Sequence, residues 1–278
     1  MPDEFIDAHH HLWRYSQEQY PWMLAGMEGI RRDFLIPELQ SATHEAGING
    51  TVAVQARQTI EETKWLLDLA GTNSLIRGVV GWVPLIHADV MTHLETFAGD
   101  AKLKGVRHVL HDEPDDFYML RDGFNRGVSR LKDFDLRYDI LIFERHLSQT
   151  IQFVDRHPNQ LFVVDHIAKP CIKNQLLSPW QELILELAKR ENVYCKLSGM
   201  VTEADWNHWT ESDLRPYFDI VLTAFGPKRL MFGSDWPVVL VACGYKRWAD
   251  MVRSWISGLS ATEQSSMMSG TAKRAYSL

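Results

Sequence analysis

The 278-residue sequence predicts an α/β fold, a single (β/α)8 barrel of the TIM type. Eight short runs rich in β-branched and aromatic residues alternate with segments whose apolar residues recur at helical spacing. Such alternation gives a parallel sheet, and eight repeats are the number that closes a barrel. An open doubly wound sheet is the alternative, but no glycine-rich phosphate-binding motif follows any run. We expect one barrel domain over residues 1–278, with its active site at the carboxyl ends of the strands.

The eight expected strands are short and evenly distributed along the chain. They cover residues 5–8, 51–56, 78–85, 105–110, 138–143, 161–166, 193–197 and 230–233. Helix signals lie between them: Pro37 marks a start and Gly47 an end, and Thr59 and Glu62 have the spacing of a capping box. Further helices are expected before residues 157–158, after 178–179 and before 226–227. Each expected strand is therefore followed by an expected helix.

Composition excludes several classes of partner. Hydrophobic residues make up 45% of the chain, which suits a large buried core, and the net charge of −7 argues against nucleic acid or an anionic membrane surface. No apolar run approaches the roughly 20 residues of a membrane helix, and the start of the chain lacks a signal-peptide pattern. Cys171, Cys195 and Cys243 are widely spaced, so we expect reduced thiols and a cytoplasmic protein with a small-molecule substrate.

The most informative segment is Asp7-Ala8-His9-His10-His11, at the end of the first expected strand. Side chains alternate along a strand, so His9 and His11 point one way and His10 the other. Two imidazoles on one rigid strand can hold two positions around a zinc-like ion. The alternative is a polar strand end whose histidines are only hydrogen-bonded.

Other polar and aromatic side chains also fall at the expected strand ends. They are Gln55, Arg57, Trp82, Arg107, His108, Asp165, His166, Lys169, Ser234, Asp235 and Trp236. His166 is either a third metal ligand or a hydrogen-bonded core residue. Asp235 is either a turn cap or a carboxylate that faces the histidines, takes a proton from water and passes it to a leaving group.

Four segments together resemble the amidohydrolase superfamily: the Asp-x-His-x-His start, Asp165-His166 with Lys169-Pro170, the residues 233–237 and the late residues 270–276. Residues 5–13 and 105–108, with 112–114, are most similar to its lactonase branch, which holds sugar lactonases and 2-pyrone-4,6-dicarboxylate lactonases. This resemblance implies a distorted barrel with His9, His11 and His166 as metal ligands or polarising groups. It also implies that Asp235 is the acid/base and a possible fourth ligand.

One departure from the superfamily bears on the metal. Members with two ions bridge them by a lysine or carboxylate at the end of strand four, but here Lys102 and Lys104 stand at its beginning and Arg107 at its end. Strand five offers no histidine before His146. We therefore expect one divalent ion or none.

The expected activity is hydrolytic ring opening of a small lactone. An aldonolactone of the L-fucono or L-rhamnono type is the first candidate, a dicarboxylate lactone the second, and decarboxylation or an inactive ligand-binding barrel remain alternatives. Substrate contacts are expected from Arg57, Trp82, Arg107, His108, Lys169 and Trp236, although Arg107 could instead belong to a structural ion pair. The loop 14–33 contains Trp22, Met23 and Met27. These apolar side chains are expected either to cover the site or to contact a second subunit.

Overall fold

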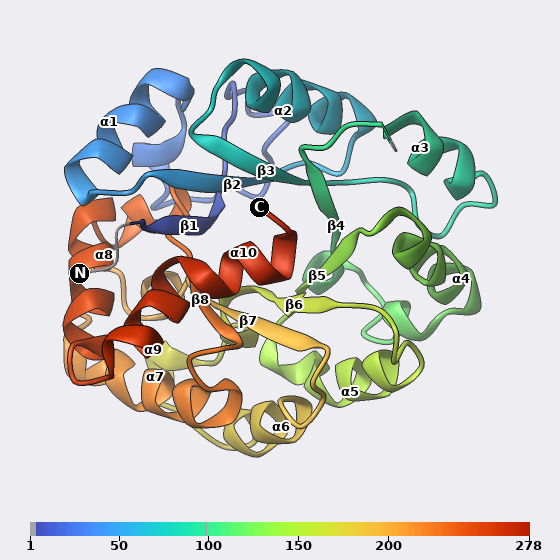
Figure 1. The fold of residues 1–278 in the computed structure, drawn as a ribbon. Helices are drawn as coiled ribbons and strands as arrows, with labels where there is room; N and C mark the ends of the chain where they lie inside the picture. The colour runs from blue at the N-terminus through green and yellow to red at the C-terminus, as the bar shows by residue number, and fades with distance from the viewer. Residues whose placement is uncertain (1–3, 98) are drawn as a thin grey trace.

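The computed structural model describes residues 4–97 and 99–278 and confirms the predicted (β/α)8 barrel (Figure 1). Its eight strands follow one another around the sheet in chain order, and each neighbouring pair from β1 to β8 is parallel. The strands are β1 Ile6–His10, β2 Gly50–Val54, β3 Ile76–Gly81, β4 Leu103–Val109, β5 Arg137–Leu141, β6 Phe162–Val164, β7 Val193–Leu197 and β8 Leu230–Phe232. A bridge between His10 and Trp236 closes the ring between β1 and the segment after β8.

Helices surround the ring of strands, except for the last one, which lies across it (Figure 1). They are α1 Ile36–Ala46, α2 Ile60–Thr72, α3 Val90–Phe97, α4 Asp122–Leu131, α5 Leu147–Asp155, α6 Trp180–Leu187, α7 Glu211–Phe225, α8 Tyr245–Ile256, α9 Ala261–Ser265 and α10 Thr271–Tyr276. Gly47 ends α1 with a left-handed φ of 66°, which glycine adopts without steric cost. Among the described residues, none of these helices is both long and apolar enough to cross a membrane.

Two expected local features differ from the structure. Thr59 accepts the backbone N–H of Glu62 at 3.1 Å, but the Glu62 carboxylate turns away from the helix to the N–H groups of Ala56 and Arg57. Strand β6 ends at Val164, before Asp165 and His166, because His166 has a φ of 52° that extended backbone cannot accommodate. His166 therefore lies in a turn that follows the strand.

The core has two parts. The larger part lies between the sheet and the surrounding helices. The smaller part includes inward residues of the strands, such as Val52, Val80 and Val163, together with Tyr276 from α10. Helix α10 lies across the ring of strands (Figure 1), where Lys104 at the start of β4 donates to the carbonyl oxygen of Ser277. The C-terminal helix thus covers the amino-terminal end of the barrel and leaves the carboxyl ends of the strands for a site.

Gly127 gives a test of how closely α4 packs against Leu85, in the segment that follows β3. A Cβ at Gly127 would collide with the carbonyl oxygen of Leu85, so Gly127→Ala should destabilise the fold by about 1–3 kcal/mol although alanine favours helices. In α2, a Cβ at Gly71 would meet no described atom within 4 Å, so Gly71→Ala should be neutral or stabilising by up to about 1 kcal/mol. Urea unfolding of both variants measures the difference, and equal effects would contradict the packing described.

Candidate functional site

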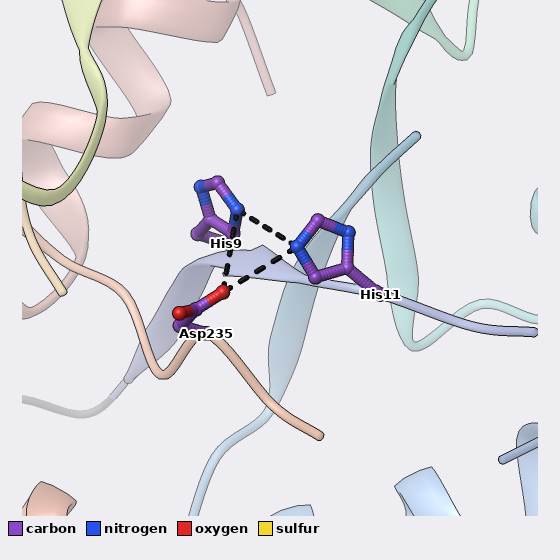
Figure 2. A group of neighbouring side chains, drawn as sticks. All are labelled: His9, His11 and Asp235. Atoms are coloured by element: carbon purple, nitrogen blue, oxygen red, sulfur yellow. Dashed lines mark hydrogen bonds and ion pairs between the residues drawn. The ribbon is translucent and has the colours of Figure 1, made fainter. Parts of the chain in front are cut away.

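The two histidines of β1 converge as the alternation predicts. Their Nε2 atoms lie 3.2 Å apart, while His10 turns away and its Nε2 lies 3.0 Å from Thr51 Oγ1. The Asp235 Oδ1 atom is 3.4 Å from His11 Nε2 and 3.8 Å from His9 Nε2, so all three side chains point toward one another (Figure 2). His9, His11 and Asp235 thus form one buried cluster at the carboxyl end of the barrel.

Asp7 connects the segments that carry this cluster. Its Oδ1 accepts the backbone N–H groups of His9 at 3.0 Å and Ser234 at 2.8 Å. Its Oδ2 accepts the hydroxyls of Ser234 at 2.6 Å and Tyr245 at 2.7 Å. Sequence reasoning noted Asp7 only as part of a motif and assigned it no function. The structure places it as the link that holds Ser234, and with it the adjacent Asp235, against β1.

His166 reaches the cluster from an unusual turn. Residues His166, Ile167, Ala168 and Lys169 have φ values of 52°, 49°, 63° and 46°. Left-handed backbone costs non-glycine residues about 1–2 kcal/mol each. The Trp180 indole N–H donates to the Ile167 carbonyl at 2.8 Å, and His166 Nδ1 lies 2.9 Å from Ser198 Oγ. These contacts leave His166 Nε2 3.9 Å from Asp235 Oδ1, facing the cluster.

Asp165 organises a second layer of buried charge. Its Oδ1 lies 3.2 Å from His9 Nδ1 and 3.0 Å from Lys196 Nζ, and its Oδ2 accepts Arg107 Nη1 at 3.0 Å. Lys196 also contacts Asp139, at 2.5 Å. Sequence reasoning missed Lys196 and Asp139. The available signal was a charged residue in the middle of each apolar strand.

Burial and neighbouring charges set the protonation of the cluster. Burial holds the pKa values of His9 and His166 well below the usual range, so both imidazoles are neutral at pH 7. Burial alone would raise the pKa of Asp235, but His166, His11 and Lys169 outweigh it and the pKa is lowered. At neutral pH the site therefore presents the Asp235 carboxylate to the uncharged imidazoles of His9 and His166.

The donor set fits one divalent cation. His11 Nδ1 lies 2.8 Å from the Val54 carbonyl, which only accepts, so His11 Nε2 carries a free lone pair toward His9 and Asp235. In a tetrahedral zinc site with bonds of about 2.0–2.2 Å, ligand atoms lie roughly 3.3–3.6 Å apart, close to the distances within the cluster. His9, Asp165 and His166 form a second possible group. Arg107 and Lys196 already neutralise Asp165 there, which disfavours a second ion.

The aromatic residues and the histidine that were expected to contact substrate differ in how far they are buried. Trp82 is half-buried, and its Nε1 donates to His108 Nδ1 at 3.2 Å. Glu113 lies 2.6 Å from the other ring nitrogen of His108, so that imidazole supports Trp82. Trp236 is only 2% exposed and packs edge-on against Phe34.

The three expected cations each have an anionic partner. Arg107 pairs with Asp165 as described, Lys169 lies 2.5 Å from Glu203, and Arg57 lies 3.8 Å from Glu62. Of the three, Arg57 has the most exposed side chain, at 23%. Lys169 and Arg57 remain accessible in part, whereas Arg107 is buried.

Comparison with known proteins adds a family and close relatives. A model of the amidohydrolase family matches residues 6–278. An L-fucono-1,5-lactonase of Burkholderia multivorans is 43% identical over 98% of this chain and 96% of its own, and one of Burkholderia ambifaria is 37% identical over 85% and 81%. A crystal structure of a Burkholderia multivorans amidohydrolase with bound zinc superposes with a TM-score of 0.95, at 43% identity over 99% of each chain.

Glu62, beside this site, gives a test by pH. Burial raises its pKa from 4.5 to about 7, against the opposing effects of its backbone N–H donors and Arg57. The folded protein therefore binds this proton more tightly than the unfolded chain, and stability falls as pH rises from about 4.5 to about 7. Between pH 5 and pH 8, wild type should lose about 1–3 kcal/mol relative to Glu62→Gln, measured by urea unfolding. If the free energy of unfolding changed with pH in the same way for both proteins, the pKa of Glu62 would not be raised in the folded state.

Proposed function

This chain belongs to the amidohydrolase family, and we propose that it is a lactonase that opens the ring of a small sugar lactone. The proposed substrate is L-fucono-1,5-lactone or a related neutral aldonolactone. Support comes from the relatives named L-fucono-1,5-lactonase. The observation that carries the proposal is the Asp235 carboxylate, which faces the imidazoles of His9, His11 and His166 at the carboxyl end of the barrel.

Asp235 is the proposed acid/base. Its lowered pKa keeps it ionised at neutral pH, so it can take a proton from a water molecule as that water attacks the lactone carbonyl. The protonated Asp235 then returns the proton to the ring oxygen as the C–O bond breaks, and the product is a hydroxy acid. The Lys169 ammonium, which stays charged at neutral pH, helps to keep this carboxylate ionised, and His166 faces it at 3.9 Å.

We assign the metal site to His9, His11, His166 and Asp235, with one zinc-like ion as the cofactor. The donor atoms of His9, His11 and Asp235 lie within 4.8 Å of one another, and His166 faces Asp235 at 3.9 Å. When bound, such an ion would polarise the lactone carbonyl and stabilise the negative charge that develops on its oxygen. The hydrogen bond from His11 to the Val54 carbonyl orients that imidazole. The contact between His9 and Asp165 does the same for the second imidazole.

The pairing of cations favours a neutral substrate. Arg107 and Lys169 each contact a carboxylate at 3.0 Å or less, so neither brings an uncompensated positive charge to the site, and Arg57 lies at the looser distance of 3.8 Å from Glu62. A dicarboxylate lactone would have to displace one of these carboxylates or lie beside it. A sugar lactone needs only hydrogen bonds from groups such as Lys169 and a flat apolar surface such as Trp82.

Replacing Asp235 tests the assigned chemistry. Asp235→Asn keeps the shape of the side chain but removes the base, so kcat on L-fucono-1,5-lactone should fall by about 10³-fold. Asp219→Asn, on the exposed face of α7, is the matched control and should keep wild-type kcat. Acid release followed with a pH indicator measures both. A kcat for Asp235→Asn within tenfold of wild type would remove Asp235 from the chemistry.

The charge of the substrate is a separate test. We expect kcat/KM for neutral aldonolactones to exceed that for 2-pyrone-4,6-dicarboxylate by about 100-fold or more, which corresponds to about 3 kcal/mol in transition-state binding. A panel of both substrate classes in the same assay measures the ratio. Faster turnover of the dicarboxylate would mean that one of the three cations is released from its partner to bind substrate.

A further inference from the structure

Lys196, at the centre of the barrel, is not accounted for by the proposed chemistry. It lies on β7 and its side chain is 0% exposed. Its Nζ lies 2.5 Å from Asp139 Oδ2, 3.0 Å from Asp165 Oδ1 and 3.2 Å from His9 Nδ1. Barrel interiors are normally filled by residues such as Val, Ile and Leu, so a lysine at this position requires a reason.

The contacts of Lys196 extend to the end of the chain. Tyr276, on the C-terminal helix α10, donates its hydroxyl to the same Asp139 Oδ2 atom at 2.7 Å. Asp139 lies on β5 and is also fully buried. A continuous row of polar contacts therefore runs from α10 through Asp139, Lys196 and Asp165 to His9. We call this row the buried relay.

The charges around the buried relay balance. Lys196 and Arg107 are the cations and Asp139 and Asp165 the carboxylates, and all four side chains are 3% exposed or less. Replacing a buried ion pair by apolar residues is often neutral or stabilising, so such a group is weak evidence for a stabilising role. Its contact with His9 points to a role in the site instead.

The geometry also defines how His9 is held. Arg107 Nη1, which can only donate, lies 3.3 Å from His9 Nε2, so that nitrogen is an acceptor. His9 Nδ1 is then the protonated nitrogen and donates to Asp165 Oδ1, so its 3.2 Å approach to Lys196 Nζ is a contact and not a hydrogen bond. Lys196 on Oδ1 and Arg107 on Oδ2 together fix both oxygens of Asp165, and hence the direction in which His9 Nε2 points.

We propose that Lys196 and Asp139, held by Tyr276, are positioning residues that act through Asp165 to aim His9 at the Asp235 cluster. The proposal rests on the site assigned above. It extends that site to residues that do not touch the substrate and that contact only one of the proposed metal ligands, His9. Loss of such outer partners typically lowers metal affinity or activity by about 10–100-fold.

The double variant Lys196→Met/Asp139→Asn tests this without leaving an unpaired charge, because it removes one cation and one carboxylate. We expect kcat on L-fucono-1,5-lactone to fall about tenfold with little change in KM, and affinity for Zn²⁺ alone, measured by chelator competition, to fall about tenfold. The Nδ1–H signal of His9 in NMR, assigned by its loss in His9→Asn, should exchange with water at least tenfold faster. A folded double variant with all three readouts unchanged would overturn the proposal.

A second variant keeps the proposal testable should the double variant not fold. Tyr276→Phe removes only the hydroxyl on Asp139, and it should change the same readouts in the same direction by about two- to fivefold. Tyr217→Phe is the matched control, because its buried ring also loses one hydrogen bond, to the Leu176 carbonyl. Equal effects of the two would contradict the buried relay. The zinc and NMR readouts remain informative if wild type hydrolyses no lactone, which separates this proposal from the proposed function.

Discussion

The arrangement of side chains in the centre of this barrel depends on one buried carboxylate, Asp165, which needs positively charged or hydrogen-bonding partners. Asp165 is fully buried, and burial alone would raise its pKa, yet Lys196, His9 and Arg107 hold that pKa well below its usual value. Those three donors come from three different strands, β7, β1 and β4. One carboxylate thus sets the relative positions of side chains that are far apart in sequence. Because His9 is among them, the same pairing orients the first ligand of the proposed site.

Backbone conformation supplies the other half of the site. His166 and Asp235, which face each other at 3.9 Å, both have left-handed φ values, of 52° and 59°. Such conformations are costly for side chains with a Cβ and occur mostly where surrounding contacts enforce them. Trp180 bonds to the turn after β6, and Asp7 holds the segment before Asp235. The strain therefore coincides with the groups to which we assign the chemistry.

The sequence predicted the barrel, the convergence of His9 and His11, and the approach of His166 and Asp235, because hydrophobic alternation and strand-end polarity are local signals. It did not predict the left-handed turn of His166 to Lys169, since that conformation depends on tertiary contacts such as the one with Trp180. The pairing of Lys196 on β7 with Asp139 on β5 also depends on contacts between strands that are not hydrogen-bonded to each other. A pattern of residues indicates which side chains point inward but not which of them meet.

Hydrolysis in H₂¹⁸O tests the central claim most directly. If water attacks the lactone carbonyl with Asp235 as the base, L-fucono-1,5-lactone incubated with the enzyme should yield L-fuconate with one ¹⁸O atom in its carboxylate and none in the ring-derived hydroxyl. Mass spectrometry of product fragments locates the label, and a no-enzyme control measures the spontaneous reaction. Label in the hydroxyl, or formation of carbon dioxide without uptake of water, would contradict the account.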